Sequence, residues 1–451
     1  MELPHKPSLQ RSLSFRHALL FGMAFMAPVT VFATYGIAVY ETNGMVAAGY
    51  LIAMCIMLIT AASYVHLVKA FPAAGGSYSF TQKGINPHVG FLVGWTILMD
   101  YVFSPLISAL LVGIMLSSFF PAVPLWIWIL LFICVITTIN IMGIKLAANL
   151  NMALVLLQIL ICVAFIALGI QDLLAGKGAG TLVSSLPFFD PQVAFPSLLA
   201  ILPLLCFSFL GFDAVTTLAE ETVKPEKTMP RVVMLIPLIG GVLFVLVTYV
   251  AQLVQPNLQS FSNPDSAGME LFIQVGGNLM AACFLAVIVL AGLASAIASG
   301  ASGARILYAM GREGVLPKRF FGYLSPRYRT PVANLLVIAA IATMAIFLDI
   351  LTATALINFG ALLAFTCVNI AVISHFYIRT KQRAGKGVLL YLLLPLIGAL
   401  CTGIFWLNLG APALLLGGAW LAAGFLYLLY VTNMFRQPPP SLHIEASETS
   451  I

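Results

Sequence analysis

Long apolar runs alternate with short polar breaks along nearly the whole chain. Each run is close to the about 20 residues with which an α-helix crosses a bilayer. Twelve spans are predicted on this pattern, at 17–40, 46–68, 89–118, 123–143, 150–170, 195–219, 232–254, 276–304, 332–349, 351–378, 388–408 and 412–433. The pattern therefore predicts an all-α polytopic membrane protein.

Composition and charge agree with this interpretation. Of the 451 residues, 61% are hydrophobic and 8% are charged, whereas a soluble domain has about 25% charged residues. With a cytoplasmic N-terminus, every Lys and Arg except Lys177 falls on the cytoplasmic side, as the positive-inside rule requires. We therefore expect cytoplasmic segments at both ends, 1–16 and a disordered tail at 434–451, and an extracytoplasmic loop at 172–194.

Two further features bear on the setting of the protein. The chain has no Asn-X-Ser/Thr glycosylation acceptor, which fits the inner (plasma) membrane of a bacterium. The basic residues are dispersed over loops, so the net charge of +6 indicates no nucleic-acid partner.

Polar side chains recur at helical spacing inside four of the spans. Asp100 is followed by Ser104 and Ser108, which puts all three on one helical face. The same spacing recurs in three other spans, as Asp213, Thr216, Thr217 and Glu220, as Ser295, Ser299 and Ser302, and as Asn358, Thr366 and Asn369. Because charged groups at bilayer depth are costly, these faces are expected to surround a shared wet interior.

Two spans also contain helix breakers near their centres. Span 17–40 contains Pro28, and span 195–219 contains Pro203 and Gly211. Backbone groups freed by such breaks are tolerated in a membrane only where they line protein or a water-filled cavity. The two spans are five apart and enter from opposite sides, a pattern typical of two inverted five-helix repeats that meet at a midplane site. The repeats are expected at 17–171 and 195–378, followed by two extra spans within 388–433.

Each of these polar groups also has a purely structural interpretation. Asp100 could bond to a neighbouring helix, and the serines of 276–304 could be small packing residues. Glu220 and Glu221 could pair with Lys224 and Lys227 at the cytoplasmic surface instead of acting in gating.

Several long motifs resemble those of the amino acid–polyamine–organocation superfamily, in the same order along the chain. They are "FPAAGGSYSFTQKGINPHVGFLVGW" at 71–95, "LGFDAVTTLAEET" at 210–222 and "RILYAMGREGVLPKRFFGYLSPRYRTP" at 305–331. The segments "LMDYVFSPLI" and "TATALINFGALLAF" resemble those of bacterial putrescine importers. The resemblance implies a leucine-transporter-type fold with substrate held between broken spans 1 and 6.

The resemblance also implies site residues. Carriers of amino acids in this superfamily bind the substrate carboxylate at a Gly-Ser-Gly, which matches Pro28, Val29 and Thr30 here. Pro28 has no N–H to offer a carboxylate, which favours an amine. Close putrescine importers carry an Asp where this chain has Ala33, so another amine or a cationic amino acid remains open.

Two sets of residues are therefore singled out. Those expected to bind substrate are Ala27, Pro28, Thr30, Asp100, Tyr101, Phe207, Ser208, Gly211, Asp213 and Asn358. Those expected to gate or couple are Phe207, Asp213, Glu220, Glu221, Ser295 and Ser299.

The resulting hypothesis is a secondary transporter that imports a small cationic amine, with putrescine favoured, by alternating access. Proton coupling is favoured over sodium coupling, and no metal or cofactor is expected. The alternative within the superfamily is an amino acid permease. More distant alternatives are an intramembrane serine protease built on Ser302 and His375, and a channel, which would need a repeated filter sequence that the chain lacks.

Overall fold

The structure is a computed structural model of the chain. It describes residues 14–71, 76–142, 147–191, 195–218, 222–257, 261, 263–312, 316–325, 330–437 and 439. Within these residues the fold is all-helical and contains no β-strand. The α-helices are α1 (Phe15–Met26), α2 (Val31–Thr42), α3 (Val46–Ala70), α4 (Gly76–Gly84), α5 (Pro87–Phe119), α6 (Leu125–Met142), α7 (Ala147–Leu174), α8 (Phe195–Phe207), α9 (Pro225–Val254), α10 (Ala267–Arg312), α11 (Lys318–Phe321), α12 (Val332–Ala342), α13 (Ile350–Val372), α14 (Leu394–Leu407) and α15 (Ala411–Val431).

Short 3₁₀ turns, which are tighter than an α-helix, and π-helical turns, which are wider, connect or extend several of these helices. The 3₁₀ turns are η1 (Pro28–Thr30), η3 (Ala214–Leu218), η5 (Pro264–Ser266) and η6 (Thr343–Phe347), and the π-helical turns are η7 (Ile373–Arg379) and η8 (Leu389–Leu393). Helix α10 bends at Gly277, whose φ of 64° is outside the helical region.

Ten helical segments in the described part of the chain are long and apolar enough to cross a membrane. Two further apolar helices, Pro196–Phe207 and Val332–Phe347, are shorter. They correspond to the predicted spans 195–219 and 332–349. The first is short because the helix ends at Phe207, and the second because the chain becomes extended at Leu348, after the 3₁₀ turn that closes it. The protein is thus a multi-pass membrane protein.

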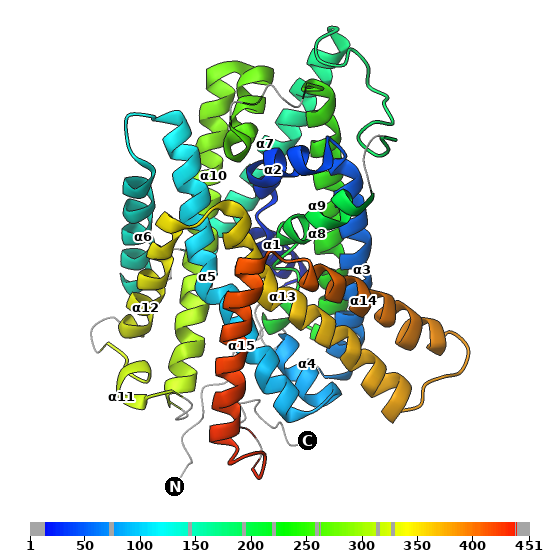
Figure 1. Cartoon of the computed structure of the whole chain (residues 1–451), viewed down its shortest axis with the longest axis vertical. Coiled ribbons are helices and arrows are strands. Elements are labelled where there is room, and N and C mark those ends of the chain that lie inside the picture. Colours follow the sequence, from blue (N-terminus) through cyan, green and yellow to red (C-terminus); the bar gives the residue numbers. More distant parts are fainter. Residues whose placement is uncertain are drawn as a thin grey trace.

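Helix α4 was not predicted as an element. It lies at the same end of the molecule as α11, whereas the loop after α7 lies at the opposite end (Figure 1). Its sequence, GSYSFTQKG, is short and polar, so it carries none of the long apolar signal by which the spans were found. It packs on α5 and α13.

Helix α5 forms the centre of the packing. It lies against α10 and α13 along much of its length and also contacts α6, α12 and α15. A second extensive contact joins α3 to α9. These two helix pairs hold α1, α2 and α8 between them, so the broken spans lie inside the molecule (Figure 1).

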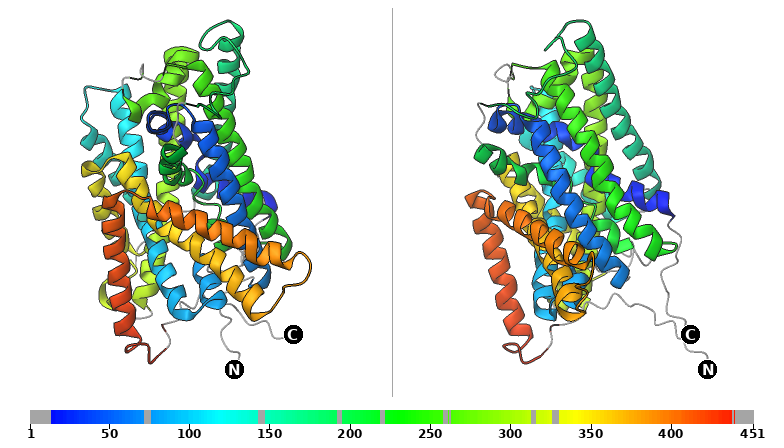
Figure 2. Two further views of the ribbon diagram at one scale, coloured as in Figure 1. Left: turned by 45° about the vertical axis from the view of Figure 1, so that its right-hand side comes forward. Right: turned by 90° about the vertical axis from the view of Figure 1, so that its right-hand side faces the viewer.

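Helix α15 lies at one edge of the molecule in both views of Figure 2. Helix α15 is nevertheless joined to α5 by a reciprocal pair of tryptophans. Trp95 Nε1 donates to the Trp420 carbonyl at 2.9 Å, and Trp420 Nε1 donates to the Trp95 carbonyl at 3.0 Å. The two rings stack with centroids 5.1 Å apart. Each half-buried indole N–H thereby donates to a carbonyl of the other helix.

Candidate substrate site

The first span breaks immediately before Pro28. Helix α1 ends at Met26, and Ala27 adopts a left-handed conformation with φ 46°. Pro28 opens the 3₁₀ turn η1, after which α2 continues the span. Because Pro28 has no N–H, the Ala24 carbonyl loses its i+4 donor, which leaves polar backbone at mid-span.

The span 195–219 breaks in a similar way. Helix α8 ends at Phe207, and the amides of Ser208, Phe209 and Leu210 bond to carbonyls three residues earlier. Gly211 then takes a φ of 109°, which L side chains rarely adopt. The chain therefore leaves the helix axis between Ser208 and Asp213, as the glycine predicted.

The two breaks meet at Gly211. A Cβ built on Gly211 would lie 2.6 Å from Phe25 Cδ1 and 3.0 Å from the Met26 backbone nitrogen. Only a residue without a side chain lets the two backbones approach this closely. The contact brings the end of α1 against the turn that follows α8.

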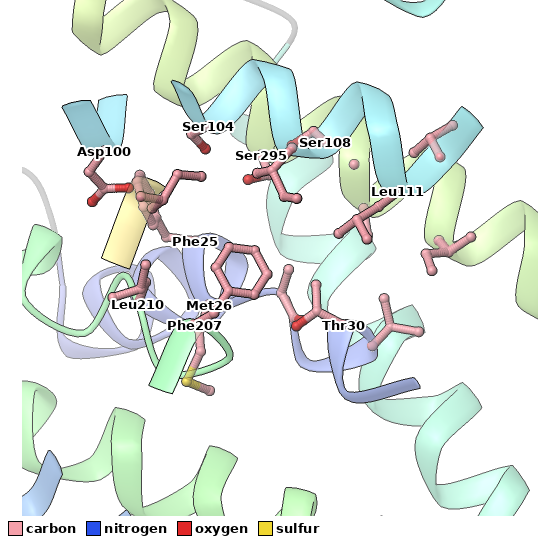
Figure 3. A pocket seen from close by; sticks show the side chains of 18 residues that line it. Phe25, Met26, Thr30, Asp100, Ser104, Ser108, Leu111, Phe207, Leu210 and Ser295 are labelled. Carbon is pink, nitrogen blue, oxygen red and sulfur yellow. The ribbon is translucent and has the colours of Figure 1, made fainter. Parts of the chain in front are cut away.

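A cavity of about 50 Å³ opens beside this junction, between the two breaks on one side and the packed pair α5 and α10 on the other (Figure 3). One water needs roughly 10–15 Å³ by the same kind of measure, so the cavity has room for several waters or for a short chain. Its lining is Phe25, Met26, Ala27, Val29, Thr30, Asp100, Ser104, Ile107, Ser108, Leu111, Val112, Phe207, Leu210, Ile288, Ala291, Gly292, Ser295 and Ile357.

The polar side chains of this lining include one ionisable group, the carboxyl group of Asp100. Asp100, Ser104 and Ser108 project from the same face of α5, and Ser295 of α10 lies beside Ser108 (Figure 3). Thr30 is the polar side chain of the first break, and its hydroxyl donates to the Ala27 carbonyl at 2.8 Å. Among the described lining residues, Asp100 is the single charged side chain, and no Lys, Arg or His balances it.

Five of the predicted residues therefore come together in the cavity: Ala27, Thr30, Asp100, Phe207 and Ser295. Phe207 stands at the end of α8, where its ring faces the first break (Figure 3). Pro28 lies within the break but outside the described lining. Glu220 and Glu221 lie outside the described residues.

Asp213 lies on the broken segment, next to but not on the cavity wall. It immediately precedes η3, and its carboxylate accepts hydrogen bonds from the backbone N–H groups of Asp213 itself, Gly211 and Ala214. The Thr216 hydroxyl donates to the Asp213 carbonyl at 2.6 Å. Asp213 is close enough to Asp100 for the two carboxylates to repel when both are ionised. The expected polar stripe from Asp213 does not form on a continuous helix, because the chain turns here.

Four other predicted residues do not line the cavity, and their side chains bind or pack against other parts of the protein. Ser208 is fully buried and bonds to the Tyr50 hydroxyl at 2.9 Å. Asn358 donates to the Pro203 carbonyl at 2.7 Å, which ties α13 to α8. Ser299 donates to the Ser295 carbonyl of its own helix at 2.8 Å. Tyr101 meets the Phe25 ring edge-on at 6.2 Å between centroids.

Aromatic side chains fill the space between the second break and α4. The Tyr64 ring packs edge-on against Phe80, Phe212 and Phe365, with centroids 5.6 to 6.1 Å apart. The Tyr64 hydroxyl bonds to Ser77 of α4. This cluster closes the α4 side of the site with apolar surface.

Much of the cavity wall was not identified from sequence. Ile107, Leu111, Val112, Ile288 and Gly292 are apolar or small, so nothing in their identity separates them from lipid-facing or packing residues. Their spacing does: Ile107 and Leu111 lie at i+7 and i+11 from Asp100, Val112 lies at i+4 from Ser108, and Ile288 and Gly292 lie at i−7 and i−3 from Ser295.

Two observations on the described residues concern other kinds of site. No group of three or more His, Cys, Asp or Glu is placed to hold a metal ion there. His375, the proposed base for Ser302, packs against the rings of Phe71 and Phe376 with centroids 4.8 Å away, and no described hydrogen bond joins it to Ser302.

Comparison with known proteins identifies the family. The amino acid permease family model matches residues 17–431. The low-affinity putrescine importer PlaP of Escherichia coli (strain K12) is 41% identical over 433 residues, 96% of each chain. The vacuolar cationic amino acid transporter 4 of Arabidopsis thaliana is 28% identical over 83% of this chain and 64% of its own. The branched-chain amino acid permease BcaP of Bacillus subtilis (strain 168) is 26% identical over 94% of this chain and 93% of its own. The chain therefore belongs to the amino acid permease family, within the amino acid–polyamine–organocation superfamily that its motifs indicated.

Proposed function

We propose that this protein is a secondary transporter that imports a small cationic amine, with putrescine as its substrate. The observation that carries this proposal is the Asp100 carboxylate, which enters the cavity without a cationic side chain among the described lining residues. The similarity to PlaP over nearly the full length of both chains supports the same substrate.

The chemistry of the site favours an amine over an amino acid. A desolvated ammonium needs an anionic partner, and Asp100 supplies one. The four-carbon chain of putrescine is comparable in length with the about 6 Å rise from Asp100 to Ser104, so the second ammonium reaches the serine hydroxyls. An α-carboxylate would need amide donors at the first break, where Pro28 has none.

The architecture that we propose has twelve spans, with two inverted five-helix repeats followed by α14 and α15. The packing supports it, because helices five spans apart pair: α3 with α9, α5 with α10 and α6 with α12. The broken spans pair as well, through contacts of α1 with η3 and of α2 with α8. Such repeats place a substrate site at the membrane midplane.

We further propose cytoplasmic termini in a bacterial inner membrane and coupling to protons. The end of the molecule that carries α4 and α11 would face the cytoplasm, and the aromatic cluster around Tyr64 would then form the inner gate. Asp213 is the candidate proton carrier because it sits on the broken segment and interacts with Asp100. A neutral Asp213 would ease the repulsion between the two carboxylates whenever no ammonium is bound.

Uptake of labelled putrescine into proteoliposomes tests the proposal. Asp100→Asn should reduce uptake at least about a hundredfold, since a buried ammonium loses its counter-charge. Asp172→Asn is the matched control. Asp172 does not line the cavity, and its Oδ1 pairs with Nζ of the exposed Lys177 at 2.8 Å. Equal uptake by both variants would contradict a substrate role for Asp100.

A further inference from the structure

The cavity changes character along its length. Helix α5 lines it with one face, which runs from Asp100 through Ser104 and Ser108 to Leu111 and Val112. At 1.5 Å per residue, the last two side chains lie about 17 Å along the helix from Asp100. The described wall is therefore acidic at one end, hydroxyl-lined in the middle and aliphatic at the other end.

Helix α10 packs beside α5 on the same wall and follows the same order from hydroxyl-lined to aliphatic. Ser295 lies at the hydroxyl-lined middle (Figure 3), and the lining continues through Gly292 to Ile288. Gly292 is level with Val112, because a Cβ on Gly292 would lie 2.5 Å from Val112 Cγ2. On both helices, the hydroxyl side chains therefore give way to apolar or small residues at the same level of the cavity.

The cavity offers one counter-charge and a long apolar extension. A diamine placed there matches one ammonium to Asp100, while its second ammonium lies among neutral hydroxyls. A monoamine leaves no second charge to desolvate, and its hydrocarbon tail buries against Leu111, Val112 and Ile288. The apolar end has no role in binding a chain as short as putrescine.

We infer that the site also binds primary monoamines with an unbranched hydrocarbon tail, with the ammonium at Asp100 and the tail in the aliphatic end of the cavity. This inference rests on the proposed amine site and extends its substrate class. Linear n-alkylamines are the simplest such ligands. Their affinity is expected to rise with chain length until the tail fills the aliphatic end.

The first experiment measures competition of labelled putrescine uptake by n-alkylamines from ethylamine to octylamine. Binding of the same amines to the purified protein in nanodiscs is measured by calorimetry. Each added methylene should lower the inhibition constant about two- to fourfold, the gain from burying one CH₂. The n-alkanols of equal length partition into lipid but carry no ammonium, so they should compete at least about tenfold more weakly.

A pair of variants on α5 locates the tail. Leu111→Ala removes wall from the aliphatic end and should weaken hexylamine at least fivefold relative to ethylamine. Leu110→Ala is the matched control, because Leu110 is buried in the core at 1% exposure but does not line the cavity. It should leave the ratio of the two amines unchanged. Ala291→Val, which narrows the same end, gives an independent test and should also lower that ratio.

The outcomes separate this inference from the proposed function. If the protein takes up putrescine but the inhibition constants of the n-alkylamines do not change with chain length, the tail site is wrong and putrescine transport is unaffected. Chain-length-dependent binding without putrescine uptake would support the tail site and refute putrescine as substrate. An equal effect of Leu111→Ala and Leu110→Ala, or competition by alkanols as strong as by amines, would also overturn the inference.

Discussion

Gly211 and Asp100 set the properties of the site at the scale of single residues. Gly211 lets the second break approach the Phe25 side chain and the Met26 backbone nitrogen, which no residue with a side chain could do without displacement. Asp100 gives the space beside that contact its charge. One residue therefore determines the shape of the junction, and the other determines which ligands it attracts.

Replacement of Gly211 by Ala should damage the junction itself. The new Cβ would lie 2.6 Å from Phe25 Cδ1 at a φ of 109°, a strain of about 1–3 kcal/mol. We expect a lower melting temperature of the purified protein and at least tenfold less putrescine uptake. Gly418→Ala is the control, because Gly418 is helical and has nothing within 4 Å of a built Cβ. Similar behaviour of the two variants would show that the breaks do not need this close contact.

Replacement of Asp213 by Asn should separate binding from coupling. The amide oxygen can still accept from the Gly211 and Ala214 N–H groups, but the side chain can no longer carry a proton. We expect the variant to fold and to lose accumulation of putrescine driven by a pH gradient in sodium-free vesicles. Asp213→Glu should keep part of the activity.

Two results would count against this role for Asp213. Normal accumulation by the Asn variant would exclude it as the proton carrier. A variant that fails to fold, judged by gel filtration, would make Asp213 a structural residue. Uptake by the unmodified protein that requires sodium and ignores the pH gradient would exclude proton coupling altogether.

At the scale of elements, α15 braces the helix that carries Asp100. Trp95 lies five positions before Asp100 on α5, and its reciprocal bonds to Trp420 fix that part of α5 against α15. Gly424 makes room for the pair, since a Cβ there would lie 2.4 Å from the Trp95 ring. The peripheral helix α15 is therefore part of the support of the site.

Trp420→Phe should weaken this brace. It removes one indole donor and part of the stacked area, a loss of about 1–2 kcal/mol. We expect the melting temperature in detergent to fall by a few degrees. Trp126→Phe is the control, because Trp126 is 51% exposed at the molecular surface and should change the melting temperature little. A fall of the same size in both variants would contradict the bracing role.

Sequence patterns located most of these elements but fewer of the site residues, for physical reasons. Apolar runs identify spans because a helix in lipid must be apolar on its outer surface. Pro28 and Gly211 identified the two interruptions, whereas the predicted break at Pro203 is wrong, because α8 continues through it to Phe207. The prediction that residues at helical spacing share one face holds only for an unbroken helix, and the helix is broken at Asp213. The asparagines illustrate a second limit. A polar group in a span must find a partner, and Asn358 finds it in the Pro203 carbonyl instead of in the cavity.

At the scale of the whole molecule, the scaffold and the broken spans have different roles. The pairs α3–α9 and α5–α10 form long continuous contacts, whereas α1 and α8 end at the cavity. A substrate that binds between the breaks and the scaffold contacts both, so its binding can bias their relative position. This is the arrangement that alternating access requires.

The central claim is that this cavity takes an amine and lacks a cradle for an α-carboxylate. Competition between putrescine and ornithine for labelled putrescine uptake in proteoliposomes tests it most directly, because ornithine is putrescine with a carboxylate added. With Pro28 at the first break, putrescine should compete at least tenfold better, a difference of about 1.4 kcal/mol. If ornithine or a neutral amino acid competes tenfold better than putrescine, the claim is wrong.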